Sequence, residues 1–314
     1  MHAGPDSCPE FMAMVELVSA GNPLQKKRIQ HFIGTQDAGY WTFAEHVCRT
    51  INRSFLRTPG ERAAAAASYN RMTMDFLREQ IRFRKTGVYP VTDAGAAQQS
   101  VYNRPDVMRY YMVGLFLSYL FWPNHYAMFC FFRDYLSDLP GLDAYLEIAP
   151  GHGLFAAETL RRFPAVQAAL LDISPTSIKV TGEILQSFGA ASDRVCYING
   201  DFLTTPIDRG GFDFVCMGEV LEHVNDAPAF LRRAGSLLLP GGRIFMSTCT
   251  NSPAIDHVYF FRNISEIRAL VRSAGLEIVK EKVLPAEPVS EECCEQERVT
   301  VNYCAILKKS GGLL

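Results

Sequence analysis

The chain has 314 residues, which is enough for one large domain or for two ordinary ones. Hydrophobic residues make up 48% of it and charged residues 20%, so the chain can bury a sizeable core. The 31 basic and 33 acidic side chains nearly balance, and no segment is strongly basic. A surface that binds a nucleic-acid backbone therefore has no electrostatic support, and we expect no nucleic-acid partner.

The nine cysteines include no pair with the C-x-x-C spacing of a zinc knuckle or a redox site. Their odd number, and an N-terminus without a basic region followed by an apolar run, predict a cytoplasmic protein. The most apolar stretch, residues 112–132, is interrupted by Pro123, Asn124 and His125. We interpret it as buried helix and expect no membrane partner. The sequence allows a homo-oligomer but does not indicate one.

Residues 1–138 carry helix-period patterns and almost no strand signal. Apolar spacing predicts a helix at 41–56, which Thr58-Pro59-Gly60 ends. A second helix is predicted at 61–84, where five consecutive alanines favour the helical state. A loop at 86–100 and helices at about 105–120 and 124–137 follow. We therefore expect an all-helical domain over residues 1–138.

From about residue 144, short apolar runs alternate with amphipathic helices, the pattern of a mostly parallel sheet. Pro240-Gly241-Gly242 predicts a tight turn into the fifth strand. The acidic segment 285–297 is interpreted as a solvated connection. A second domain is thus expected over residues 139–314. Its strands are predicted at 144–149, 166–172, 195–199, 212–217, 243–249, 276–283 and about 298–307, and its helices at about 153–163, 175–188, 226–238 and 263–273.

A glycine-containing turn follows the first predicted strand, in Tyr145-Leu-Glu-Ile-Ala-Pro-Gly-His-Gly-Leu-Phe-Ala156. Gly151 and Gly153 let the backbone turn sharply and let a ligand approach closely. The amides that open the next helix favour a carboxylate or a phosphate. Alone, the G-x-G-x-x-A pattern also fits a plain tight turn, or a dinucleotide-binding fold in which Asp172 holds a ribose.

Further motifs follow the later strands. Asp172 closes the second strand, where its carboxylate suits two ribose hydroxyls. Asp201 and Phe202 follow the third strand and offer an acidic group and an aromatic ring to an adenine base. The segment Cys216-Met-Gly-Glu-Val-Leu-Glu-His-Val224 follows the fourth strand, and Leu237-Leu-Leu-Pro-Gly-Gly-Arg-Ile-Phe245 leads into the fifth.

As an ordered set, E-I-A-P-G-H-G, L-L-D, N-G-D-F, G-E-V-L-E-H-V and L-L-P-G-G-R resemble the class I methyltransferases that use S-adenosylmethionine (SAM). The resemblance is to the branch containing the ubiquinone-biosynthesis O-methyltransferases and many small-molecule tailoring enzymes, and it covers about residues 140–310. It departs at Ala149, where the family often has glycine. It implies a Rossmann-like α/β domain with sheet order 3-2-1-4-5-7-6 and an antiparallel last strand, and it argues against a nicotinamide dehydrogenase.

The resemblance also implies a SAM site at the carboxyl ends of the strands. Helices placed just before the cofactor domain commonly cover this pocket, so Tyr111 and His125 are lid candidates that can contact the cofactor or the acceptor. The other implied cofactor residues are Glu147, Ala149, Gly151 and Gly153 for the methionine part, Asp172 for the ribose, Ile173, Asp201 and Phe202 for the adenine, and Glu219 beside the cofactor.

Methyl transfer is an in-line displacement, which mainly needs alignment and the exclusion of water. His223, beside Glu219, is the candidate catalytic base; alternatively it only packs the turn after the fourth strand. The set Glu219, Glu222, His223 and His257 looks like the cluster that binds a divalent metal in small-RNA 3′-end methyltransferases. Against this, E-V-L-E-H is widespread in enzymes that use no metal.

We therefore expect SAM-dependent methyl transfer to a small molecule, such as a biosynthetic or natural-product intermediate, with the helical domain as acceptor wall and lid. The alternatives are a metal-assisted methyltransferase, an RNA or protein methyltransferase without a basic face, and a non-catalytic SAM-fold binding subunit. A degenerate binding subunit need not retain the glycine turn and the acidic residues, which favours an enzyme.

Overall fold

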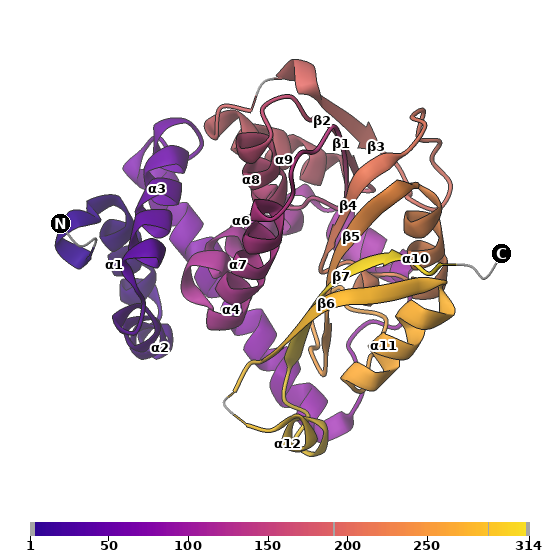
Figure 1. The fold of residues 1–314 in the computed structure, drawn as a ribbon. Coiled ribbons are helices and arrows are strands. Elements are labelled where there is room, and N and C mark those ends of the chain that lie inside the picture. Colours follow the sequence, from indigo (N-terminus) through magenta and orange to yellow (C-terminus); the bar gives the residue numbers. More distant parts are fainter. Residues whose placement is uncertain (1–3, 191, 288, 312–314) are drawn as a thin grey trace.

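The computed structural model describes residues 4–190, 192–287 and 289–311. Within this part a helical half precedes a half built on one sheet, and the two pack side by side (Figure 1). None of the described helices is long and apolar enough to cross a membrane. The helical half contains α1 (Pro9–Gly21), α2 (Pro23–Gly34), α3 (Ala38–Ser54), α4 (Pro59–Thr86), α5 (Ala94–Ala97), α6 (Pro105–Phe121) and α7 (Pro123–Ser137).

Local signals explain where these helices begin and end. Proline stands at the start of α1, α2, α4, α6 and α7, where its missing N–H costs no hydrogen bond. Thr58 and Glu61 form a reciprocal capping box at the start of α4, and Gly87 ends that helix with a φ of 72°. The helices predicted at 41–56, 61–84, 105–120 and 124–137 are confirmed as α3, α4, α6 and α7. The predicted loop at 86–100 instead contains α5 and leads into a π-helical turn, Gln98–Tyr102.

The sheet has seven strands in the order β3-β2-β1-β4-β5-β7-β6, which confirms the predicted topology. Strand β7 runs antiparallel to both of its neighbours, and the other pairings are parallel. The strands are β1 (Ala144–Ile148), β2 (Gln167–Asp172), β3 (Val195–Asn199), β4 (Phe212–Gly218), β5 (Leu238–Thr250), β6 (Leu276–Pro285) and β7 (Val301–Lys309), and the helices are α8 (Leu154–Arg162), α9 (Pro175–Ser187), α10 (Ala227–Ser236), α11 (Ile264–Ser273) and α12 (Glu291–Gln296).

One local prediction in this half was wrong. Pro240-Gly241-Gly242 does not turn into the fifth strand but lies inside β5. There it forms a bulge, because Phe212 pairs with Leu238 while Phe214 pairs with Arg243. The acidic segment 285–297 connects β6 to β7 as predicted, and Glu291, Glu292, Glu295 and Glu297 are exposed. It contains a short helix, α12, whose first turn is capped by the Ser290 side chain.

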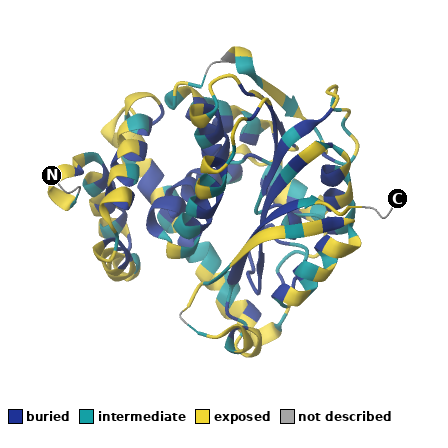
Figure 2. Cartoon of the chain, viewed as in Figure 1, coloured by how far each residue is buried: buried dark blue, intermediate teal, exposed yellow. Residues whose placement is uncertain are grey.

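Hydrophobic core lies on both faces of the sheet (Figure 2). Side chains alternate between the faces along a strand, so Tyr145 joins one core and Leu146 the other. Helices α10 and α11 cover the second face. On the first face, Phe132 of α7 packs against Phe245 of β5 with 5.0 Å between ring centroids. The core of the helical half is therefore continuous with that of the sheet.

Candidate active site

A cavity of about 1350 Å³ lies where β1, β2 and β4 end. Its floor is formed by the residues that follow these strands, and its walls include side chains of α2, α4 and α6 and the first turn of α7. Pockets that hold one small ligand usually measure about 300–1,000 Å³. This cavity therefore has room for a cofactor together with a second molecule.

The turn after β1 is built from backbone conformations. Ala149, Gly151 and Gly153 have φ values of 51°, 52° and 69°. This region costs a non-glycine residue about 1–2 kcal/mol, so the turn would favour glycine at position 149, where this chain has alanine. Ala149 and Gly151 line the cavity. Gly153 does not belong to its lining; a Cβ atom there would lie 3.0 Å from Thr181 Cγ2, so Gly153 allows α8 to pack against α9.

Two buried carboxyl groups flank this turn. Glu147 on β1 accepts a hydrogen bond of 2.7 Å from the Tyr145 hydroxyl, and burial raises its pKa to about 8. Asp172, the last residue of β2, accepts hydrogen bonds from Ser174 N at 2.8 Å and Ser177 Oγ at 2.5 Å. Burial raises the pKa of Asp172 to about 6. Both groups line the cavity.

The three residues predicted for the adenine, Ile173, Asp201 and Phe202, also line the cavity. Ile173 is 38% exposed, a large fraction for an apolar side chain, and is free to cover a ligand. Asp201 accepts a hydrogen bond of 2.8 Å from Leu203 N. Phe202 is buried and packs against Phe230, with 5.2 Å between ring centroids. We call this region, comprising Glu147, Ala149, Gly151, Asp172, Ile173, Asp201 and Phe202, the cofactor end.

Glu219, just after β4, combines backbone strain with an unsatisfied carboxylate. Its φ is 54°, and its N–H lies 3.1 Å from Ser247 O and 3.0 Å from Ser247 Oγ. Asn302 Nδ2 donates to Glu219 Oε2 at 2.9 Å, and Asn124 Nδ2 donates to Asn302 Oδ1 at 2.6 Å. Oε1 is buried without a hydrogen-bond partner among the described residues, and burial raises the pKa of Glu219 to about 7. Such residues cluster at functional sites.

His223 is held by oxygen atoms on one side of its ring. Nδ1 lies 3.2 Å from Asp256 O, 3.3 Å from Asp256 Oδ2 and 3.0 Å from the Tyr102 hydroxyl. A carbonyl and a carboxylate only accept hydrogen bonds, so this network assigns the proton to Nδ1. In the neutral ring, Nε2 then carries the lone pair. His223 lines the cavity.

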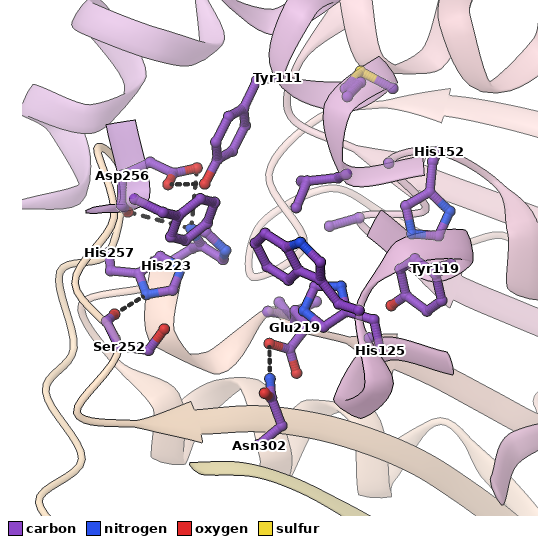
Figure 3. Close-up of a pocket in the computed structure, with 18 of the residues that line it drawn as sticks. Tyr111, Tyr119, His125, His152, Glu219, His223, Ser252, Asp256, His257 and Asn302 are labelled. Carbon is purple, nitrogen blue, oxygen red and sulfur yellow. Dashed lines mark hydrogen bonds and ion pairs between the residues drawn. The ribbon is translucent and has the colours of Figure 1, made fainter. Parts of the chain in front are cut away.

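Asp256 organises this side of the cavity. It is buried, and its Oδ1 accepts from the Tyr111 hydroxyl at 3.0 Å (Figure 3). Its Oδ2 accepts from the Tyr102 hydroxyl at 3.2 Å. Burial raises the pKa of both tyrosines, so they remain donors. Sequence reasoning missed Asp256, Tyr102 and Asn302. The only local signal was an acid beside His257, and Tyr102 comes from a remote segment without a motif. Tyr111, which also donates to Asp256, was predicted as a lid residue.

The predicted metal ligands fall into two overlapping groups. Ligand atoms of Glu222, His223 and His257 lie within 4.8 Å of one another, while Glu219 groups with Glu222 and Cys249. Glu222 Oε2 accepts from Thr248 Oγ1 at 2.7 Å, and Oε1 is buried without a partner among the described residues. His257 Nδ1 lies 2.6 Å from Ser252 O and must donate to it, which leaves Nε2 free. The structure therefore does not bring all four predicted ligands together in one group.

The cavity lies where the strand order reverses, between β1 and β4, and open α/β sheets bind their ligands at such a switch point. The sequence pattern described as "Methyltransferase domain" matches residues 124–281, about half of the chain. The chain therefore belongs to the class I SAM-dependent methyltransferases and is an enzyme of that class.

Individual relatives support this assignment. A ubiquinone biosynthesis O-methyltransferase from Xanthomonas euvesicatoria pv. vesicatoria (strain 85-10) is 30% identical over 184 residues, covering 52% of this chain and 75% of the relative. The solved structure of mitomycin 7-O-methyltransferase MmcR is similar with a TM-score of 0.53 at 16% identity, over 95% of this chain and 94% of that one. Phosphoethanolamine N-methyltransferase 2 from Haemonchus contortus, solved with SAM, has a TM-score of 0.51 at 13% identity, over 71% of this chain and 61% of that one. The two structures share the fold.

Proposed function

We propose that this methyltransferase methylates a hydroxyl group of a small-molecule acceptor, such as a natural-product intermediate, with His223 as the general base. One observation carries the proposal. Asp256 holds the proton of His223 on Nδ1, which leaves the Nε2 lone pair free to accept a proton, and His223 lines the cavity. The O-methyltransferase names of two relatives agree with a hydroxyl acceptor.

The helical half supplies the acceptor's surroundings in this proposal. Aromatic side chains of Phe76, Tyr111 and Trp122 line the cavity, with Phe76 and Tyr111 stacked at 6.2 Å between centroids. Leu77 and Ile81 of α4 also line it and are 41% and 49% exposed. An apolar acceptor would remove these surfaces from water, which is favourable by about 25 cal/mol per Å². We call Tyr102, Tyr111, His223, Asp256 and the lining face of α4 the acceptor end.

When bound, SAM would supply an activated methyl group for the acceptor oxygen, and its sulfur would keep the electron pair of the broken bond. His223 Nε2 takes the proton of the acceptor hydroxyl. The carboxylate of Asp256, beside Nδ1, stabilises the resulting imidazolium. The apolar walls exclude water, which strengthens these electrostatic interactions.

The test combines transfer and binding measurements. The purified enzyme is incubated with methyl-labelled SAM and a panel of hydroxylated aromatic compounds, and the products are identified by mass spectrometry. We expect His223→Ala to lower turnover by about 10²–10⁴-fold, the usual contribution of a general base. The affinity for S-adenosylhomocysteine should stay the same. Full turnover of the variant, or methylation only at carbon or nitrogen, would contradict the proposal.

A second candidate is metal-assisted transfer, favoured by the unsatisfied Glu222 Oε1 beside His223 and His257. These residues would hold the ion, which would lower the pKa of the acceptor hydroxyl. The one lone pair on His223 Nε2 cannot both bind a metal and accept a proton, so the two candidates exclude each other there. Loss of turnover on chelation, restored by magnesium or manganese, would support the metal. Full turnover after chelation, with no metal by elemental analysis, would support the base.

A further inference from the structure

Two buried histidines outside the proposed transfer step line the cavity. His152 lies in the turn between Gly151 and Gly153, and His125 lies in the first turn of α7. Only 8% and 6% of their surfaces are exposed. The ring of Tyr119 packs against both, with centroid distances of 4.6 Å to His152 and 5.1 Å to His125 (Figure 3). The two imidazoles therefore form one group at the glycine turn.

The hydrogen bond of His152 fixes its tautomer. The backbone N–H of Leu154 donates to His152 Nδ1 at 3.1 Å, so Nδ1 carries a lone pair and no proton. The neutral ring then has its proton on Nε2, which has no partner among the described residues. Burial lowers the pKa of His152 to about 3, so the ring stays neutral near pH 7. His152 thus presents a hydrogen-bond donor at the amino-terminal end of α8, where negative charge is favoured.

His125 has the opposite tautomer. The Ser118 hydroxyl has one proton, which it donates to Leu115 O at 2.6 Å. Its oxygen lies 2.7 Å from His125 Nδ1 and must therefore accept the proton of that nitrogen. Nε2 of His125 is left as an acceptor, again without a partner among the described residues. Burial lowers the pKa of this ring to about 3 as well.

A fixed donor and a fixed acceptor on one wall match the two ends of a zwitterion. We propose that His152 and His125 bind the α-amino-acid end of the methyl donor. This inference rests on the proposed function in one respect, that the cavity is the site of SAM. His152 Nε2–H donates to the α-carboxylate, and His125 Nε2 accepts from the α-ammonium. Neutral imidazoles suit this ligand because a cationic clamp would repel both its ammonium and its sulfonium group.

The experiment compares ligands that lack one group at a time. Calorimetry measures the binding of S-adenosylhomocysteine, its decarboxylated and deaminated analogues, and 5′-methylthioadenosine, which lacks the whole amino-acid end. The variants are H152F and H125F, which keep the aromatic packing, and H152Q and H125Q, whose amide reaches about as far as Nε2. His46→Phe is the control, since His46 is exposed and lies outside the cavity lining.

We expect H152F to bind S-adenosylhomocysteine about 10- to 100-fold more weakly, the usual loss for a hydrogen bond to a charged group, and to bind the decarboxylated analogue unchanged. H125F should show the same loss, with the deaminated analogue unaffected. Each glutamine variant should recover most of the affinity, and methylthioadenosine should bind equally to all.

Several results would overturn the assignment. Unchanged affinity for S-adenosylhomocysteine in H152F or H125F removes that histidine from the subsite. An equal loss for every ligand, methylthioadenosine included, means that the histidine only supports packing. A loss in H125F that the deaminated analogue shares would assign the ammonium to another acceptor, such as Glu147. Because only cofactor analogues are used, these outcomes are independent of whether the wild-type enzyme methylates a hydroxyl.

Discussion

The two ends of the cavity are built by different means. At the cofactor end, the positions of Ala149 and Gly151 follow from left-handed backbone conformations at a strand end. At the acceptor end, Tyr102, His223 and Asp256 meet through side-chain hydrogen bonds between segments more than 30 residues apart. The cofactor end is thus a local property of the sheet, whereas the acceptor end exists only when the helical half is docked. Substitutions should therefore separate SAM binding from methyl transfer.

The largest expected effect is at the glycine turn. In Gly151→Val, the new Cβ atom would lie 3.9 Å from Ala149 O, an ordinary contact distance, so the substitution causes no clash with the protein at Cβ. Because Gly151 lines the cavity, we expect S-adenosylhomocysteine to bind at least about 100-fold more weakly, a loss of about 2.7 kcal/mol. Calorimetry measures this change.

Gly189→Val is the matched control for this substitution. Gly189 also has a positive φ, 73°, and open space around it, and it does not line the cavity. Both variants carry a similar backbone strain of about 1–2 kcal/mol. If both lost the same affinity, the effect would come from strain, and the turn would be misplaced as a cofactor site.

The next effect in size concerns Asp172, the carboxylate expected to hold the ribose. Asp172→Ala should weaken SAM binding by about 1.5–3 kcal/mol, because two hydroxyls lose a charged acceptor. Burial raises the pKa of Asp172 to about 6, and ribose hydroxyls stabilise the ionised form. Wild-type affinity should therefore rise with pH up to about this value, and the variant should lack that rise. Asp208→Ala, exposed and outside the cavity lining, is the control; a variant that binds SAM normally would remove Asp172 from the site.

A smaller effect is expected at the acceptor end. Tyr102→Phe removes the hydroxyl that lies 3.0 Å from His223 Nδ1 and 3.2 Å from Asp256 Oδ2. The direct contacts between His223 and Asp256 remain in this variant, so we expect a loss of about 0.5–1.5 kcal/mol, the contribution of an ordinary hydrogen bond. Turnover should then fall by about 2- to 12-fold, while the affinity for S-adenosylhomocysteine stays the same. Tyr110→Phe is the control, since that hydroxyl donates to Asp75 and the residue does not line the cavity. Weaker cofactor binding in Tyr102→Phe would mean that the two ends are not separable.

The same contrast explains what sequence reasoning found. The strands were predicted from hydrophobic runs, and Gly151, Asp172, Asp201 and Phe202 from glycines, acids and an aromatic residue at strand ends, which are local signals. The order of the strands, and the choice of Glu147, Ala149 and Ile173, came from the resemblance to the family. Gly153 was assigned to the ligand, although it serves helix packing, because a glycine does not reveal which neighbour requires it. Tyr102 ends a π-helical turn, Gln98–Tyr102, and lies just past the loop predicted at 86–100, while Asp256 lies in an irregular segment after β5. Their roles depend on tertiary contacts that leave no periodic pattern.

The smallest expected effect tests the electrostatics of the cofactor end without its ligand. Glu147 is buried, and burial raises its pKa from about 4.5 to about 8. The native state therefore holds a proton that the unfolded state releases between these values, so the stability of the cofactor-free enzyme falls as pH rises through this window. Glu147→Gln keeps a carbonyl for the Tyr145 hydroxyl and removes the ionisation. The variant and the wild type should have the same Tm below about pH 4.5. Above about pH 8 the Tm of the variant should be higher by a few degrees, as expected when about 1 kcal/mol changes Tm by a few degrees.

Other buried carboxyls, such as Glu219, are present in both proteins, so their effects cancel in the difference between the two Tm values. Glu16→Gln, exposed on α1, should melt like the wild type throughout. Identical melting curves for Glu147→Gln and the wild type at every pH would show that Glu147 is ionised at no cost in the free enzyme, and that the cofactor end is already solvated before SAM arrives.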